Sequence, residues 1–218
     1  MVDAAKNRMH WEFTYIFFLT VLITTLAGIV RELPHAIAIA GFTAALAANI
    51  WIWKKRISRT VIYLHNGLNI VCALFLAHML SAYVFVSESA IIGAALGVVV
   101  MDVFSFTKRG RFTLNAKLIG QNNTAARLSI CLPVPGKRGL IPLIGVGDLV
   151  YYSMLTMVAL KSDSEFALLF AVLPILGGQL LNIAVIFAVK DKKGFKGFPA
   201  TLMPGLLFIA FYITGIPA

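Results

Sequence analysis

The sequence predicts an all-α integral membrane protein, a polytopic bundle of about seven transmembrane helices. The chain is 60% hydrophobic and only 13% charged, and its mean hydropathy is +0.88. Soluble domains are roughly 45–50% apolar and about 25% charged. Seven apolar stretches near the length of a membrane span follow one another, and none alternates as the strands of a membrane β-barrel do. Helices are therefore expected, because a helix satisfies its own backbone hydrogen bonds in lipid.

Each predicted helix is an apolar stretch that ends at charged or turn-forming residues. In chain order, the predicted spans are residues 11–30, 36–53, 61–86, 90–106, 140–160, 166–189 and 200–216. Their connections are short except for residues 108–139, and so long a connection in a compact protein is usually functional. No internal repeat divides the chain. We expect one transmembrane domain, 1–218, with a three-helix part at 1–89 and a four-helix part at 90–218.

Basic residues gather in alternate connections. Of the 19 Lys and Arg residues, all except Arg31 and Lys161 fall in the amino-terminal tail or after the second, fourth and sixth predicted helices. The positive-inside rule makes these segments cytoplasmic, so the amino terminus lies in the cytoplasm and the carboxyl terminus outside. The net charge of +10 is then mainly a topology signal that also favours anionic lipid head groups. Nucleic-acid binding is not expected, because it needs a basic face with interleaved aromatic residues.

Carboxylates, rather than a metal or cofactor, are the candidate chemical groups of this chain. The cysteines Cys72 and Cys131 fall in a predicted helix and a cytoplasmic connection, so we expect no disulfide. No Cys/His cluster has metal-ligand spacing, and we expect neither a metal nor a cofactor. Of the nine acidic residues, seven lie at tails, connections or helix ends. Only Asp102 and Asp148 fall well inside a predicted span, where a charge is costly and usually functional.

The two aspartates are predicted to meet. Asp102 lies six residues before Lys108, about 9 Å below the cytoplasmic edge at 1.5 Å per helical residue. Asp148 lies nine residues after Gly139, roughly 13 Å deep by the same rise. Their helices run in opposite directions, so both side chains reach a similar depth. Two carboxylates this close in a poorly solvated site share one proton, which is the requirement of aspartic proteolysis.

Glycines are predicted to bring the two helices close together. Gly93 and Gly97 form a small-residue ridge on the helix of Asp102, and Gly145 and Gly147 thin the helix of Asp148.

Four stretches resemble a known family in the same order. They are VVVMDVFSF around Asp102, GVGDLVYYSML around Asp148, AVLPILGGQLLNIAVIFAVK in the next predicted helix, and KGFPATLMPG before the last one. Together they resemble the GxGD intramembrane aspartyl proteases of the presenilin and signal peptide peptidase type, and they are most similar to presenilin and its archaeal homologues. The resemblance covers about residues 90 to 217.

The resemblance implies a presenilin-like fold and assigns roles to particular residues. Asp102 and Asp148 would be the catalytic pair, and Gly145 and Gly147 the glycines of the GxGD motif. The first two positions of the family's Pro-Ala-Leu element would be Pro199 and Ala200, with Thr201 in place of leucine. Met101 stands where presenilin has a tyrosine. Presenilin-type enzymes have nine helices, so seven would make this chain a short form.

The resemblance also implies substrates that are single-span transmembrane proteins or signal peptides. Such a substrate must unwind before water can attack it. Residues 127–134 show strand-like alternation at Leu128, Ile130 and Leu132, so we expect this segment to pair with substrate by strand addition, or else to be an ordinary connection. Residues 114–126 are expected to form an interfacial amphipathic helix. The sequence leaves open whether the chain acts alone, as a homo-oligomer or with accessory subunits.

Two other functions remain open from the sequence. A prepilin or preflagellin peptidase also uses a GxGD aspartate, but a lysine usually follows it closely, and GVGDLVYY lacks that lysine. A proton-coupled transporter could use Asp102 and Asp148 as a relay, although no inverted repeat is visible. The expected location is the plasma membrane of a prokaryote, specifically an archaeon.

Overall fold

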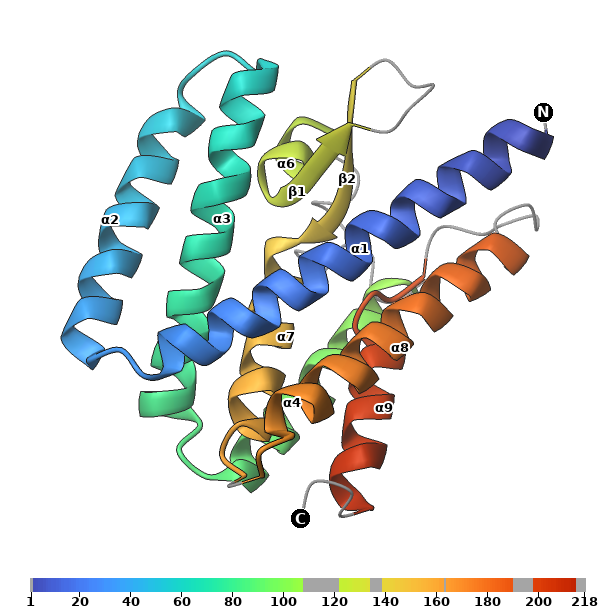
Figure 1. Ribbon diagram of the computed structural model, residues 1–218. Coiled ribbons are helices and arrows are strands. Elements are labelled where there is room, and N and C mark those ends of the chain that lie inside the picture. The colour runs from blue at the N-terminus through green and yellow to red at the C-terminus, as the bar shows by residue number, and fades with distance from the viewer. Residues whose placement is uncertain (1, 108–121, 134–138, 163, 190–197, 215–218) are drawn as a thin grey trace.

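The chain folds into a bundle of helices with one small sheet. The computed structural model describes residues 2–107, 122–133, 139–162, 164–189 and 198–214. Its elements are α1 (Val2–Arg31), α2 (His35–Trp53), α3 (Arg59–Met79) with the π-helical turn η1 (Leu80–Val84), α4 (Glu88–Ser105), α6 (Asn122–Arg127), β1 (Ser129–Pro133), β2 (Leu140–Gly145), α7 (Val146–Ala159), α8 (Ala167–Val189) and α9 (Leu202–Ile213). In Figure 1, α1 begins near the top and α9 ends at the bottom.

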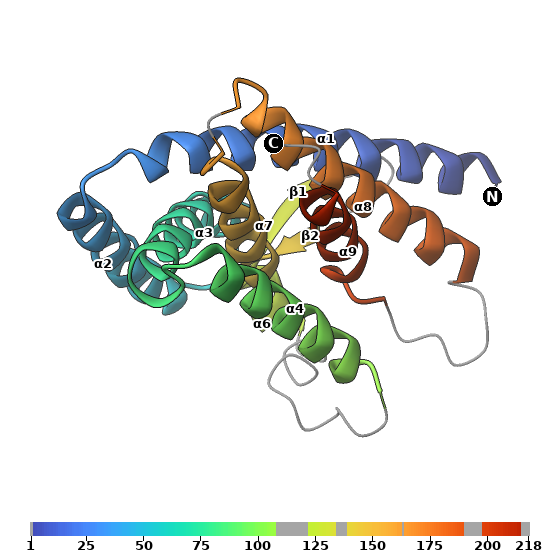
Figure 2. The same cartoon turned by 90° about the horizontal axis from the view of Figure 1, so that it is seen from below.

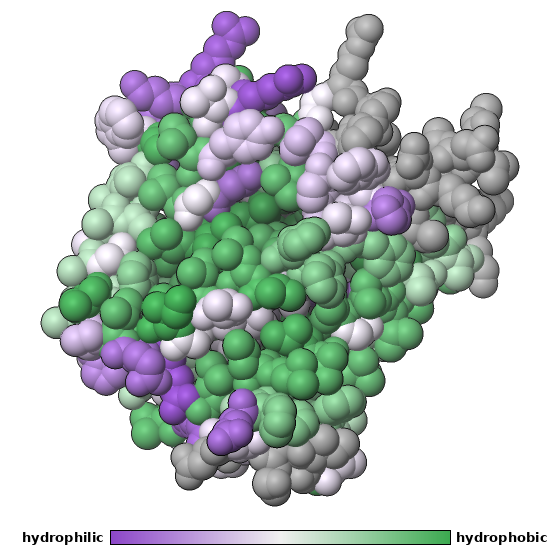
Figure 3. All heavy atoms as spheres, in the orientation of Figure 1, coloured by the Kyte–Doolittle hydropathy of each residue, from purple (hydrophilic) through white to green (hydrophobic). Residues whose placement is uncertain are grey.

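The structure confirms the prediction of a helical membrane protein. Within the described residues, four helices are long and apolar enough to cross a membrane: His10–Arg31, His35–Trp53, Arg59–Val84 and Ala167–Val189. The apolar helices α4, α7 and α9 are shorter. Figure 3 shows apolar residues as a band across the molecule, with hydrophilic residues toward its two ends. Side chains arranged in this way match the layered environment of a bilayer.

The fifth predicted helix is partly wrong. Residues 140–160 were expected to be helical throughout, but Leu140–Gly145 forms the strand β2 and the helix α7 begins at Val146. Pro142 has no backbone N–H and disfavours a helix interior, whereas β1 offers this segment a partner strand. The all-α class therefore needs one addition, a two-stranded sheet. The amphipathic helix expected at 114–126 is described only from Asn122, where α6 begins.

Helix α7 lies at the centre of the bundle. Leu149 and residues 151–159 are all buried, so the helix has no polar outer face. It contacts α1, α3, α4 and α8, and Figures 1 and 2 show it surrounded by these helices. A helix that is apolar on all sides is stable only where other elements cover it, and this requirement places α7 in the core. The segment that carries Asp148 is thereby held by both halves of the chain.

The sheet is an antiparallel pair whose outer edge on β1 is covered. Ser129 lies opposite Gly145 and Pro133 opposite Leu140, with a bulge at Leu143. On the other side of β1, Asn66 of α3 donates to the Cys131 carbonyl at 2.7 Å and accepts from its N–H at 2.9 Å. The amide side chain thus takes the place of a further strand. The outer edge of β1 is therefore occupied at Cys131, and the free edge of the sheet is that of β2.

A buried arginine fastens the sheet to α2 and α3. Arg127 is 8% exposed and donates to the Lys55 carbonyl at 2.7 Å and the Ile52 carbonyl at 3.4 Å. Its guanidinium also lies 3.2 Å from His65 and over the ring of Trp53. A cation that binds the last carbonyls of a helix compensates the negative end of the helix dipole. The burial of Arg127 is therefore explained by its role at the end of α2.

The close helix contacts do not occur at the glycines that the sequence suggested. A Cβ atom at Gly93, Gly97 or Gly147 would meet nothing within 4 Å, so these glycines do not mediate close packing. A Cβ at Gly178 of α8 would instead lie 2.3 Å from backbone atoms of Pro204 of α9. Glycine is therefore required at position 178, where α8 packs against α9.

Candidate functional site

Asp148 lies in the first turn of α7, directly after the strand β2. The Gly145 N–H donates to its Oδ2 at 3.2 Å, which orients the carboxylate at the start of the helix. An acidic residue here also interacts favourably with the positive end of the helix dipole. The GxG segment supplies the change from strand to helix, and Gly147 lines the cavity beside the carboxylate. Asp148 is partly buried and held in place by backbone geometry.

Asp102 lies in the last turn of α4 and is held by Thr201. The Thr201 N–H donates to Asp102 Oδ2 at 3.1 Å, and the Thr201 hydroxyl donates to the same oxygen at 2.9 Å. Thr201 is only 2% exposed, so both bonds are shielded from water. A leucine at this position would keep the N–H but lose the hydroxyl bond. The threonine side chain therefore adds a contact to Asp102.

The structure brings the two aspartates together. Both line a cavity of about 420 Å³ that also borders Leu128, Gly145 and Gly147. Both also line a larger cavity of about 880 Å³ that extends between α3, η1, α4 and α7. The depth predicted for Asp148 assumed a helical rise from residue 140, which the strand β2 invalidates, yet the carboxylates share one site.

The segment 198–201 connects three helices at this site. Pro199 is buried, and the Ala200 carbonyl accepts hydrogen bonds from the Tyr152 hydroxyl at 3.1 Å and from Asn182 Nδ2 at 2.6 Å. The next residue, Thr201, bonds Asp102. Side chains of α4, α7 and α8 therefore form hydrogen bonds with two consecutive residues, Ala200 and Thr201. The orientation of Asp102 is linked in this way to the helix that carries Asp148.

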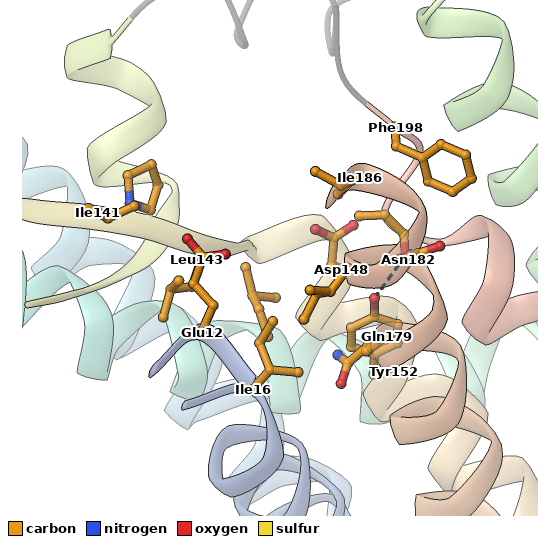
Figure 4. Close-up of a pocket in the computed structure, with 14 residues that line it drawn as sticks. Glu12, Ile16, Ile141, Leu143, Asp148, Tyr152, Gln179, Asn182, Ile186 and Phe198 are labelled. Carbon is orange, nitrogen blue, oxygen red and sulfur yellow. Dashed lines mark hydrogen bonds between the residues drawn. The ribbon is translucent and has the colours of Figure 1, made fainter. Parts of the chain in front are cut away.

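A third cavity, of about 250 Å³, lies on the other side of Asp148, between α1, β2 and α8. Its polar lining includes Glu12, Tyr152, Gln179 and Asn182, and Figure 4 shows Glu12 and Asp148 across the cavity from each other. The sequence analysis missed Glu12, because it placed this residue at the end of a helix. Helix α1 in fact begins at Val2, so Glu12 lies well inside it. The one clue in the sequence was a carboxylate beside an apolar stretch.

The three residues of the predicted substrate strand have different environments. Leu128 lines the cavity that both aspartates share. Ile130 is 2% exposed and belongs to the hydrophobic core, and Leu132 packs against that core. The strand itself is confirmed at Ser129–Pro133, whereas residue 134 lies outside the described residues. Only Leu128 of the three is placed to touch a bound molecule.

These features define a helical membrane protein with a pair of carboxylates in a cavity inside its bundle. Within the described ranges, no group of three His, Cys, Asp or Glu residues is arranged to hold a metal ion. Comparison with protein-family models, curated proteins and solved structures finds no match to this chain.

Proposed function

We propose that this chain is an intramembrane aspartic endopeptidase of the GxGD type, with Asp102 and Asp148 as its catalytic dyad. The observation that carries the proposal is the shared cavity. Two carboxylates from different helices line this cavity. Two non-helical segments, β2 and residues 198–201, also border it. Such backbone is tolerated at membrane depth where it is buried in protein or lines a water-filled cavity. Water and an unwound peptide could meet there.

In the proposed mechanism, the two aspartates divide the acid and base roles. The ionised carboxylate takes a proton from water, whose oxygen attacks the peptide carbonyl, and the protonated carboxyl donates to the carbonyl oxygen. Collapse of the tetrahedral intermediate breaks the C–N bond, and the amine leaves with a proton from the dyad. Thr201 fixes the orientation of Asp102, while the Gly145 N–H fixes that of Asp148. The chemistry needs no metal or cofactor.

The substrate strand is proposed to bind β2 rather than β1. The side chain of Asn66 occupies the outer edge of β1 at Cys131, so this edge cannot accept another strand there. Residues 141–144 of β2 instead line the third cavity, next to Asp148. Strand addition to this edge would extend the substrate and present its peptide bonds to the dyad. The substrate contact that the sequence predicted at β1 is therefore proposed at β2 instead.

The largest cavity suits the apolar part of a membrane-spanning substrate. It borders both aspartates and continues past Leu76, Leu80 and Phe85. Its lining is mainly apolar, as the hydrocarbon-facing side chains of a transmembrane helix require. Single-span transmembrane proteins and signal peptides are the proposed substrates. The proposal leaves open whether the chain acts alone, with a second copy of itself or with partner subunits.

Seven membrane passes are proposed, with the amino terminus in the cytoplasm and the carboxyl terminus outside. The basic connection between α2 and α3 lies at the same end as the start of α1, whereas Arg31 ends α1 at the opposite end. This arrangement agrees with the positive-inside rule. Helices α4, α7 and α9 are short for a span, but β2 and residues 198–201 extend two of these passes. The proposed location is a prokaryotic, specifically archaeal, plasma membrane.

The proposal is tested by cleavage of single-span reporter proteins by the purified chain in liposomes. We expect cleavage within the span that a transition-state-mimicking aspartyl protease inhibitor blocks. Substitution of Asp102 or Asp148 by Asn should abolish this cleavage. Glu32→Gln is the matched control for these substitutions, because Glu32 is an exposed carboxylate at the opposite end of α1 from the start of the chain. Cleavage at a leader junction on the cytoplasmic side would favour the prepilin-peptidase alternative. Proton-coupled uptake without cleavage would favour the transporter.

A further inference from the structure

The peptide group that joins Ala200 to Thr201 has hydrogen bonds on both of its sides. On its carbonyl side, the Ala200 oxygen accepts from the Tyr152 hydroxyl at 3.1 Å and from Asn182 Nδ2 at 2.6 Å. On its amide side, the Thr201 N–H donates to Asp102 Oδ2 at 3.1 Å. The carbonyl and the N–H of one peptide group lie in a single plane. Fixing the direction of the carbonyl therefore also fixes the direction of the N–H that binds Asp102.

Two different helices supply the donors to this carbonyl. Tyr152 lies on α7, four residues after Asp148, and Asn182 lies on α8. Both side chains are buried, with exposed fractions of 4% and 6%, so their hydrogen bonds are shielded from water. In Figure 4 they lie next to each other beside Asp148. A carbonyl oxygen has two lone pairs, so the two donors fill its capacity to accept.

The packing of α8 against α9 brings Asn182 within reach of the carbonyl. A Cβ at Gly178 would lie 2.3 Å from backbone atoms of Pro204, so glycine lets α8 approach the start of α9 this closely. Asn182 follows Gly178 by four residues and therefore lies on the same face of α8, about one turn away. The face of α8 that packs against α9 is thus also the face that binds the Ala200 carbonyl.

We propose that Tyr152 and Asn182 are positioning residues for Asp102, and that they act through the peptide group between Ala200 and Thr201. The inference rests on the proposed protease function. A donor bound to the carbonyl polarises the peptide group and strengthens the hydrogen bond that its N–H donates. Without either donor, the peptide group could rotate, and its N–H would hold Asp102 less firmly. The two residues thus affect the dyad without taking part in proton transfer.

The coupling is measured at the Thr201 amide, which requires no cleavage. Residue-resolved hydrogen exchange in detergent micelles is compared for the unmodified chain, Tyr152→Phe and Asn182→Leu. Each substitution removes one donor to the Ala200 carbonyl, from a different helix, so an effect common to both is assigned to that carbonyl. Tyr151→Phe is the matched control, because the buried Tyr151 hydroxyl has no hydrogen-bond partner among the described residues.

We expect Tyr152→Phe and Asn182→Leu each to speed exchange at Thr201 roughly 2- to 10-fold, the effect of one lost hydrogen bond. Exchange at the Cys131 amide, which donates to Asn66 in a different part of the bundle, should stay unchanged. The Tyr151→Phe control should change neither amide. In reporter cleavage, kcat should fall by a similar factor with KM unchanged, because the lost bonds orient Asp102 rather than the bound substrate.

Several results would overturn the proposal. One is unchanged exchange at Thr201 in both variants, and another is equal acceleration at Thr201 and Cys131, which is the result of general destabilisation. Faster exchange at Thr201 with an unchanged kcat, or a loss of activity confined to KM, would also overturn it. If the unmodified chain cleaves no reporter but exchange at Thr201 responds as expected, the positioning of Asp102 is supported and the protease function is overturned.

Discussion

Replacing Thr201 by valine tests the contact that holds Asp102. Valine has nearly the same shape as threonine but lacks the hydroxyl that donates to Asp102 Oδ2 at 2.9 Å. The backbone N–H bond at 3.1 Å remains. A hydrogen bond to a charged group contributes about 1.5–3 kcal/mol. If this bond orients the carboxylate in the transition state, kcat/KM for reporter cleavage should fall roughly 10- to 100-fold.

The matched control is Thr201→Ser, which keeps the hydroxyl and removes a methyl group. We expect this variant to retain activity within a few-fold of the unmodified chain, because the bond to Asp102 can still form. Rates are measured at saturating and at limiting reporter concentrations in liposomes, so that a change in kcat is separated from a change in KM. A Thr201→Val variant as active as Thr201→Ser would refute the role of the hydroxyl.

Two further predictions concern the packing around the site. Gly178→Ala should lower the thermal unfolding temperature, because the new Cβ would lie 2.3 Å from the Pro204 backbone. Overpacking of this kind costs about 1–3 kcal/mol. The control is Gly67→Ala, whose Cβ meets nothing within 4 Å and which should not lower the unfolding temperature. Asn66→Leu removes both hydrogen bonds to the Cys131 backbone and should lower the free energy of unfolding by about 1–3 kcal/mol. Faster hydrogen exchange at the Cys131 amide would report the loss, and unchanged exchange would contradict it.

The sequence predicted the helices and the carboxylate pair because both depend on local patterns. Apolar stretches of the right length define helices α1, α2, α3 and α8, and a charge inside such a stretch is easily recognised. The start of α7 could not be found in this way. Apart from Asp148, residues 140–160 are mainly apolar, and an apolar stretch alone does not distinguish a buried strand from a buried helix. Pairing with β1, which is a tertiary contact, decides for the strand.

The rest of the site depends on contacts between distant residues. Thr201 bonds Asp102 across 99 positions of sequence, and Glu12 shares a cavity with Asp148 although 136 positions separate them. No spacing rule relates such pairs. The glycines illustrate the same limit, since Gly93 and Gly97 have the expected spacing for helix packing but Gly178 makes the close contact. Which face of a membrane helix meets protein is decided by its neighbours.

The central claim is that Asp102 and Asp148 act as one catalytic unit. It is tested most directly by comparing the cleavage of one reporter in liposomes by the unmodified chain, Asp102→Asn, Asp148→Asn and the double variant. Residues that act as a unit have non-additive effects. The account predicts that the unmodified chain cleaves the reporter and that each single substitution abolishes cleavage as fully as both together. Cleavage that survives either single substitution, or losses that simply add in the double variant, would contradict it.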